Sequence, residues 1–386
     1  MAKIQYKIPF NKPYFSENSI DNIKYLIENQ GSLEGSGFFA KKCQQFLEEK
    51  YNIKKVLLTN SCTAALEMSM ILSDIKNGDE VIMPSYTFVS TANAVILRGG
   101  IPVFVDIKAD DFNINPDLIE KAITQKTKAI VPVHYSGNAC NMDKINEIAK
   151  KYNLFVIEDA AQGINSYYRN KALGSIGDLG AVSFHSTKNI QAGECGAIYI
   201  NNDNFLERAD IIIEKGTNRK AYINGQTDKY TWVDTGSSYY PSELTSAFLY
   251  AQLQDIDKIT QNRLNLLKKY NDFFKVYENK GILKTPKLLK DCTPNAHICY
   301  VLMNTKENRD NLLQYLRGNG IQAQTHFVPL HSSPFGKEHT KIGSPLNITE
   351  KVYETSLRLP LYCNMTEEEM AYIFEIMSCF LEKLCF

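Results

Sequence analysis

Short apolar runs alternate with helical patterns of apolar positions through the first half of the chain. Runs rich in β-branched residues predict strands, and apolar positions spaced three or four apart predict helices. This alternation is typical of a parallel or mixed sheet covered by helices, so we expect an α/β fold. The predicted strands are 56–58, 80–83, 102–105, 129–133, 154–157, 181–183 and 197–200, and the predicted helices are 16–29, 38–51, 64–72, 92–97, 116–124 and 142–151.

The pattern changes after residue 200. The polar, aromatic-rich stretch 215–240 predicts a long functional loop, and 242–277 predicts a long helix broken near Asp257. The rest predicts a smaller α+β unit, with strands at 298–303 and 321–325 and helices at 307–318 and 367–384. For a chain of 386 residues we predict two domains, 1–250 and 251–386.

Composition limits the classes of function. The chain has 43 Lys and Arg residues against 43 Asp and Glu, so it lacks the basic field that nucleic-acid binding usually requires. Nine cysteines without a C-x-x-C pair argue against a disulfide framework and against a metal site. The N-terminus lacks a signal-peptide pattern, and no apolar run approaches the roughly 20 residues of a membrane helix. We therefore expect a cytoplasmic protein without a membrane partner.

The stretch Ala181-Val-Ser-Phe-His-Ser-Thr-Lys-Asn189 places one lysine, Lys188, just after a predicted strand. Glycines at 193 and 196 then turn the chain back into another strand. A lysine at a strand end is able to reach into a cleft and act as a Schiff-base nucleophile. Most lysines are solvated surface charges, so this stretch alone leaves both interpretations open.

Residues that could form a cofactor site together with Lys188 lie beside other predicted strand ends. Asn60-Ser-Cys-Thr63 begins a helix, where free N–H groups favour a phosphate, although Ser and Thr are also ordinary helix caps. Asp159 follows a strand and is suited to hold a protonated ring nitrogen or to cap a helix. Phe88 suits stacking on a planar cofactor or core packing. Ser183 and His185 alternate before Lys188, so we expect one to face the cleft and the other to pack.

Together these residues offer an anion site, an acid for a ring nitrogen, a stacking ring and an amine, the set that a pyridoxal 5′-phosphate enzyme needs. At these positions the chain resembles the sugar aminotransferases of the DegT/DnrJ/EryC1/StrS family. That resemblance implies pyridoxal 5′-phosphate-dependent fold type I, with a large mixed-sheet α/β domain and a smaller C-terminal α+β domain. The matching segments are 61–66, 84–93, 158–162, 183–189, 326–331 and 357–360.

The resemblance implies roles for individual positions. Lys188 matches the Schiff-base lysine, Asp159 the pyridinium partner and Gln162 the residue beside the cofactor's phenolic oxygen. Phe88 matches the stacking aromatic ring. The matches to phosphate contacts are Cys62, Thr63 and Ser183. His326 and His331 match a histidine-containing segment near the active site of relatives, where a structural role is equally open.

Two departures from the family pattern stand out. Many members carry an Asn and an Arg that reach the site from a partner subunit, whereas this chain has Ser238 and Tyr240. A serine is still able to donate to phosphate, but a tyrosine supplies no guanidinium charge. Cys62 also replaces the usual glycine of the first phosphate loop.

Several segments, including 215–219, 228–234 around Trp232, 236–239 and 295–297, most resemble the branch that makes dTDP-4-amino-4,6-dideoxygalactose. The resemblance implies a homodimer with shared active sites, L-glutamate as donor and a dTDP-linked 4-keto-6-deoxy sugar as acceptor, for surface polysaccharide synthesis. It implies ping-pong transamination in which Lys188 moves the proton. Trp232, Tyr240, His326 and His331 are the candidate substrate contacts.

Three alternatives remain at this point. Related enzymes add the amine at C3, or at C4 with opposite stereochemistry, and the same residues would serve them. A sugar 3-dehydratase has histidine in place of the lysine, so Lys188 argues against that activity. Retention of Lys188, Asp159, Gln162 and Ser183 argues against a non-catalytic regulator or scaffold on the same fold.

Overall fold

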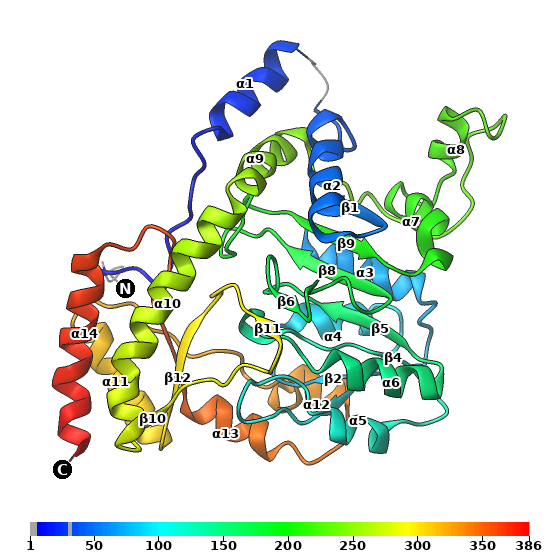
Figure 1. The fold of residues 1–386 in the computed structure, drawn as a ribbon. Coiled ribbons are helices and arrows are strands. Elements are labelled where there is room, and N and C mark those ends of the chain that lie inside the picture. The colour runs from blue at the N-terminus through cyan, green and yellow to red at the C-terminus, as the bar shows by residue number, and fades with distance from the viewer. Residues whose placement is uncertain (1–5, 30–32, 386) are drawn as a thin grey trace.

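The computed structural model describes residues 6–29 and 33–385, and an eight-stranded mixed sheet lies at its centre (Figure 1). The strand order is β1-β9-β8-β5-β4-β2-β3-β13. Neighbouring strands from β8 to β13 are parallel, whereas β9 is antiparallel to both β1 and β8. The strands are β1 (Lys55–Thr59), β2 (Glu80–Pro84), β3 (Ile101–Val105), β4 (Thr127–Ile130), β5 (Phe155–Asp159), β8 (Leu179–Ser183), β9 (Gly196–Ile200) and β13 (Lys341–Ile342).

Helices cover both faces of this sheet because successive strand side chains point to opposite sides. In β2, Ile82 joins one buried apolar cluster, while Val81 and Met83 join the other. The first cluster contains residues of α2 (Phe38–Tyr51), α5 (Pro116–Ala122), α6 (Met142–Tyr152) and α9 (Glu243–Gln254). The second contains residues of α3 (Cys62–Leu72), α4 (Val89–Ile96) and α7 (Leu206–Ile213).

The long helix α10 (Ile256–Asn279) connects this sheet to a third apolar cluster. Ile256 and Ile259 belong to the sheet's core, whereas Tyr270 and Phe274 belong to the third cluster. That cluster also lines the antiparallel strands β10 (Leu283–Lys284), β12 (Cys299–Met303) and β14 (Ser356–Leu359). It is covered by α11 (Lys306–Gly318) and α14 (Glu367–Leu381).

The remaining elements are short or peripheral. Helices α1 (Ser19–Asn29) and α8 (Arg219–Ile223) project from the body of the molecule (Figure 1). A small sheet joins β11 (Cys292–Thr293), β6 (Tyr167–Tyr168) and β7 (Lys171–Ala172), and two further helices are α12 (Pro334–His339) and α13 (Asn347–Thr355). Among the described residues, no helix is long and apolar enough to cross a membrane, and no His, Cys, Asp and Glu cluster is suited to hold a metal.

Most predicted elements are present, with three informative differences. The predicted strand 321–325 is wrong, because only Ile321 and Gln324 form isolated bridges, to Ile8 and Arg358. The predicted helix break near Asp257 lies at Asp255, between α9 and α10. The 215–240 stretch is mostly irregular but contains α8. The predicted domain boundary at residue 250 lies inside α9 and stays a prediction.

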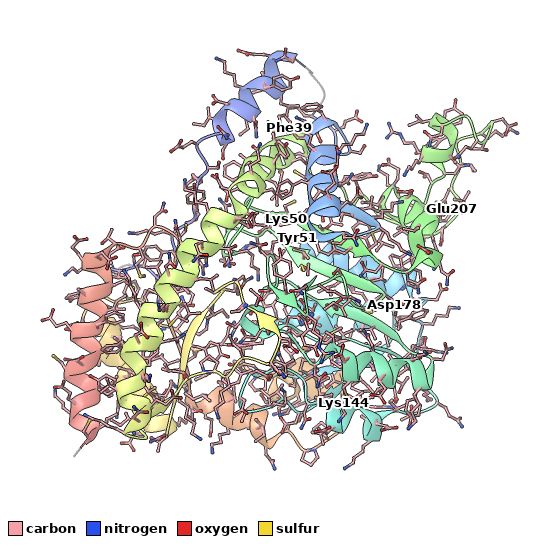
Figure 2. All side chains as sticks on the ribbon, in the orientation of Figure 1. Phe39, Lys50, Tyr51, Lys144, Asp178 and Glu207 are labelled. Carbon is pink, nitrogen blue, oxygen red and sulfur yellow. The ribbon has the colours of Figure 1, made fainter. Side chains whose placement is uncertain are left out.

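The start of α2 depends on a side chain from a distant helix. Gly37 offers α2 no side-chain cap, and the buried carboxylate of Glu243 in α9 accepts hydrogen bonds from Gly37, Phe39 and Ala40 N–H at 2.9–3.0 Å. Phe39 and Tyr51 lie at opposite ends of α2 (Figure 2), and both side chains are buried. Glu243 therefore fixes the helix that covers one face of the sheet.

We predict that Glu243→Gln lowers the free energy of unfolding by about 2–3 kcal/mol, because the amide nitrogen would face N–H donors that now bind a charged acceptor. Urea unfolding measures this change. The matched control is Glu49→Gln, because Glu49 lies on the exposed side of α2 and should change stability by less than about 0.5 kcal/mol. Equal unfolding midpoints for the two variants would contradict the role given to Glu243.

Candidate active site

A cavity of about 720 Å³ lies where the parallel strands end. The ends of β5 and β8 contribute Asp159 and Ser183, and the segment after β2 contributes Phe88. Carboxyl ends of parallel strands border the ligand crevice in α/β sheets, so the position is the expected one. Residues from distant segments complete the wall, including Phe10, Arg263, His297, Gln324, His326 and Arg358.

The first turn of α3 forms one end of the cavity. Ser61 caps this helix, since its hydroxyl accepts from Ala64 N at 3.0 Å. The N–H groups of Cys62 and Thr63 lie in the first turn, where no intrahelical acceptor exists. The Thr63 hydroxyl is 2.8 Å from the Ser90 hydroxyl. The free N–H groups of Cys62 and Thr63 form a candidate phosphate site, which we call the anion seat. The helix cap, Ser61, is a different residue.

Gly196 at the start of β9 lies against this turn. A Cβ atom at position 196 would stand 2.4 Å from Cys62 N and 2.5 Å from the carbonyl carbon of Ser61. Gly196 also pairs with Ser183 at the end of β8. Because Gly196 has no side chain, β8, β9 and the start of α3 pack closely together beside the cavity.

The carboxylate of Asp159 is almost fully buried and held by neutral donors. It accepts from the Thr91 hydroxyl at 2.7 Å and from Ala161 N at 3.1 Å. Thr91 is in turn 2.9 Å from the hydroxyl of Thr87. Neutral donors orient a carboxylate without neutralising its charge, so Asp159 is suited to hold a cationic group in the cavity.

Lys188 sits in a turn that backbone hydrogen bonds close tightly. Ser186 N donates to Gly193 O, and Lys188 N donates to His185 O, both at 2.8 Å. Burial lowers the pKa of the Lys188 amine, an effect that the nearby Cys62 and Asp159 oppose. A lowered pKa increases the fraction of free amine, which is the nucleophilic form.

Asn295, in the C-terminal half of the chain, forms hydrogen bonds with two loops of the site. Asn295 Nδ2 donates to Gln162 O at 2.8 Å, and Asn189 Nδ2 donates to Asn295 O at 2.9 Å. The second bond orients the Asn189 amide so that its Oδ1 accepts from His297 Nδ1, 3.0 Å away. His297 Nε2 is then the unprotonated nitrogen. Burial, with the nearby Lys188, lowers the His297 pKa well below its usual range, so this ring is neutral.

The cavity brings together eight of the predicted site residues: Cys62, Thr63, Phe88, Asp159, Gln162, Ser183, Lys188 and His326. Phe88 is 57% exposed, which excludes core packing, and its ring centroid lies 6.2 Å from that of Phe327. Gln162 Oε1 accepts from Ser136 N at 2.6 Å. The expectation that only one of Ser183 and His185 faces the cleft is wrong, because β8 ends at Ser183 and both residues line the cavity.

Of the two predicted site histidines, only one lines the cavity. His326 lies in the cavity, with Nδ1 2.5 Å from the Tyr135 hydroxyl and its ring stacked on Phe327. Burial lowers the pKa of His326 well below its usual range. His331 is outside the cavity lining, and its ring nitrogens contact Ser85 and Glu350, both at 2.8 Å. A role in holding the segment after β2 fits His331 better than substrate contact.

Ser238, Trp232 and Tyr240 are absent from the described lining of this chain's own cavity. Trp232 is 76% exposed, and Ser238 pairs with Glu214 in an isolated bridge. Sequence reasoning missed Phe10, Arg263, His297 and Arg358 as site residues. The last two lie in segments that carry the family resemblance, but no local pattern distinguished them from structural residues.

Comparison with known proteins shows the family to which this chain belongs. The DegT/DnrJ/EryC1/StrS aminotransferase family model matches residues 15–378. The chain is 36% identical over 378 residues to an uncharacterized protein, MJ1066, of Methanocaldococcus jannaschii, covering 96% of both chains. It is 31% identical over 392 residues to the spore coat polysaccharide biosynthesis protein SpsC of Bacillus subtilis, covering 97% of both.

Solved structures support the same family assignment. A DegT DnrJ EryC1 StrS aminotransferase from Brucella abortus has 27% identity and a TM-score of 0.86, with 94% of this chain and 95% of that one covered. The aminotransferase from Psychrobacter cryohalolentis has 25% identity and a TM-score of 0.90, with 97% and 99% covered. The fold is therefore that of the pyridoxal 5′-phosphate-dependent transferases of fold type I.

This chain belongs to the DegT/DnrJ/EryC1/StrS aminotransferase family, and it is a sugar aminotransferase with pyridoxal 5′-phosphate as cofactor. The cavity fits that group. The free N–H groups of Cys62 and Thr63 suit a phosphate, and the Asp159 carboxylate suits a protonated pyridine nitrogen. The partly buried amine of Lys188 suits a Schiff base.

We predict that Gly196→Ala weakens cofactor binding by about tenfold or more, because the added Cβ displaces the first turn of α3. Titration of cofactor-free protein with pyridoxal 5′-phosphate, followed by absorbance, measures the dissociation constant. Gly318→Ala is the control, since a Cβ there meets nothing within 4 Å. A folded Gly196→Ala protein with unchanged affinity would contradict the seat described here.

Proposed function

We propose that this enzyme transfers the amino group of L-glutamate to C4 of dTDP-4-keto-6-deoxy-D-glucose. The products are dTDP-4-amino-4,6-dideoxy-D-galactose and 2-oxoglutarate. The observation that supports this proposal most directly is that the Lys188 amine, the Asp159 carboxylate and the first turn of α3 line one cavity. The choice of sugar rests on the resemblance of segments such as 228–234, and the spore coat polysaccharide relative supports a role in surface polysaccharide synthesis.

The residues divide the work of holding the cofactor. The N–H groups of Cys62 and Thr63 and the Ser183 hydroxyl would hold its phosphate, and Phe88 would stack on its ring. The Asp159 carboxylate would hold its protonated ring nitrogen, and Gln162 would contact its phenolic oxygen. When bound, pyridoxal 5′-phosphate supplies an electron sink for the carbon that carries the nitrogen.

Lys188 moves the proton in both half-reactions. Its amine would take the proton from the α-carbon of glutamate. The amino nitrogen would stay with the cofactor, water would supply the keto oxygen, and 2-oxoglutarate would leave. In the second half-reaction the nitrogen held by the cofactor would replace the keto oxygen at C4, which leaves as water, and Lys188 would deliver a proton to C4. Burial lowers the pKa of the Lys188 amine, which favours the free amine that acts as the base.

We further propose a homodimer in which the 215–240 segment completes the partner's cavity. Trp232 is 76% exposed and Ile223 66%, on a segment that projects from the body (Figure 1). Exposed large apolar side chains gathered on one segment favour a protein interface. Ser238 then donates to the cofactor phosphate of the partner, and Trp232 and Tyr240 contact its substrate. The cytoplasmic location stays a prediction.

We expect purified protein to be yellow, and borohydride reduction to fix a pyridoxyl group on the peptide that contains Lys188. Mass spectrometry locates the modification. Lys188→Ala should take up no reducible cofactor and lose at least about 10³-fold in rate, because the variant lacks both the anchor and the base. A colourless wild-type protein that binds no pyridoxal 5′-phosphate would refute this assignment.

The acceptor is tested by incubating the enzyme with L-glutamate and dTDP-4-keto-6-deoxy-D-glucose and assigning the product by NMR. We expect an axial amine at C4. An equatorial C4 amine would point to the related enzymes of opposite stereochemistry. Activity only with a 3-keto sugar, giving nitrogen at C3, would refute the proposed acceptor while leaving the aminotransferase class intact.

A further inference from the structure

Three neutral polar side chains line the cavity without forming a hydrogen bond to any other residue among 6–29 and 33–385. They are Asn11, Gln324 and Thr325, and we call them the neutral wall. Each of the three residues is partly buried. A polar group that loses water without gaining a partner costs free energy. A cavity with three such groups is therefore suited to a ligand that supplies the missing hydrogen bonds.

Other neutral polar residues of the lining already have partners in the protein. The Thr91 hydroxyl donates to the Asp159 carboxylate at 2.7 Å. Gln162 Oε1 accepts from Ser136 N at 2.6 Å. These residues belong to the large sheet with its helices and loops, and they serve the cofactor. The neutral wall comes instead from the N-terminal segment and from the stretch before β14, outside the segments assigned to the cofactor.

A short parallel pairing brings the two segments of the neutral wall together. Ile8 forms a parallel bridge with Ile321, and Gln322 N donates to Ile8 O at 2.9 Å. Counting three residues further along both segments reaches Asn11 and Gln324, and both of these line the cavity. The pairing therefore brings one amide from near the start of the chain and one from near its end to the same wall.

Contacts on both sides of Asn11 hold the N-terminal segment in place. Before it, the Phe10 ring lies over the guanidinium of Arg358, with 4.7 Å between the ring centroid and Cζ. After it, the Tyr14 carbonyl accepts from Gln252 Nε2 at 3.0 Å. A segment that is already fixed loses little freedom when a ligand binds, so the Asn11 amide is preorganised for a contact in the cavity.

We propose that the neutral wall binds the ring hydroxyl groups of the acceptor sugar and thereby selects it. This inference rests on the proposed function. The proposed acceptor has two ring hydroxyls, at C2 and C3, and the neighbouring C4 has to reach Lys188, which lines the same cavity. A hydroxyl group both donates and accepts hydrogen bonds, and so do an amide and a threonine hydroxyl. The wall therefore has the chemistry that a sugar ring needs.

Two other parts of the substrates match the neutral wall less well. L-Glutamate presents carboxylates and an ammonium group, which bind most strongly to groups of opposite charge. The nucleotide is separated from the sugar ring by the diphosphate. When C4 is at Lys188, the ring is therefore the part of the sugar nucleotide that lies deepest in the cavity.

The test measures the two half-reactions separately on the enzyme with its cofactor. We expect Asn11→Leu, which removes the amide at nearly the same volume, to lower kcat/KM for the keto sugar about tenfold. Gln324→Met and Thr325→Val should each lower it about three- to tenfold, again by the loss of one neutral hydrogen bond. The reaction with L-glutamate should change less than about twofold. The variants lie on two segments, so one that fails to fold leaves the others to decide.

The matched control is Asn311→Leu, because Asn311 is exposed on α11 outside the cavity lining. This variant makes the same chemical change without touching the neutral wall. We expect both of its half-reactions to stay within about twofold of the wild type.

Acceptors that lack one hydroxyl group test the contact itself. The wild-type enzyme should use the acceptor without its C2 hydroxyl, or the acceptor without its C3 hydroxyl, about tenfold less well than the full sugar. In Asn11→Leu the same removal should cost less than about twofold, because the partner of that hydroxyl is already gone. If Asn11 had only a structural role, the variant would instead lose the same factor with every acceptor.

Several results would overturn the inference. Equal losses in both half-reactions would mean that the wall serves the fold or the cofactor. Calorimetry with dTDP alone, if it showed the same loss as the sugar nucleotide, would assign the wall to the nucleotide. Unchanged sugar kinetics in all three variants would refute the neutral wall while the proposed function stands. A wild-type enzyme that does not react with dTDP-4-keto-6-deoxy-D-glucose would instead refute the proposed acceptor.

Discussion

The parallel pairing of β5 with β8 is the constraint on which the rest of the site depends. Asp159 lies opposite Ala181, two residues before the end of β8, so the carboxylate and the Lys188 turn leave the sheet at the same edge. A slip of one residue in this pairing would turn Asp159 to the other face. The antiparallel strand β9 then returns from the turn and reaches the start of α3 at Gly196. One register thus places the carboxylate, the amine and the anion seat together.

Buried polar bonds hold that register. Glu158 precedes Asp159 and points to the opposite face, where its carboxylate accepts from Gly174, Ile176 and Gly177 N–H at 2.6–2.9 Å. His134 Nε2 lies 2.8 Å from the same carboxylate, and its Nδ1 accepts from Cys140 N. A network in which each buried group has partners fixes a single arrangement. Two neighbouring acids on one strand therefore have different tasks, one in the cavity and one in the scaffold.

The sequence predicted the large sheet well because its strands are short apolar runs between helices, and their burial depends on local pattern. It also located Lys188, Asp159 and Gln162 beside strand ends. It failed at 321–325, where contact comes from single bridges to distant residues rather than from a local pattern. Arg358 and His297 were missed as site residues because their place depends on how the C-terminal half folds back. The local sequence around a lone Arg or His carries no sign of what its side chain faces.

The cavity wall combines Phe10, near the start of the chain, with Arg358, near its end, and the two side chains touch. During synthesis the lysine turn and the anion seat leave the ribosome well before β14 exists. Domains form as their segments emerge, so the large sheet is able to fold first while this wall is still missing. The order of translation therefore separates two parts of the cavity: the lysine turn and the first turn of α3 form early, and the wall that contains Arg358 is added last.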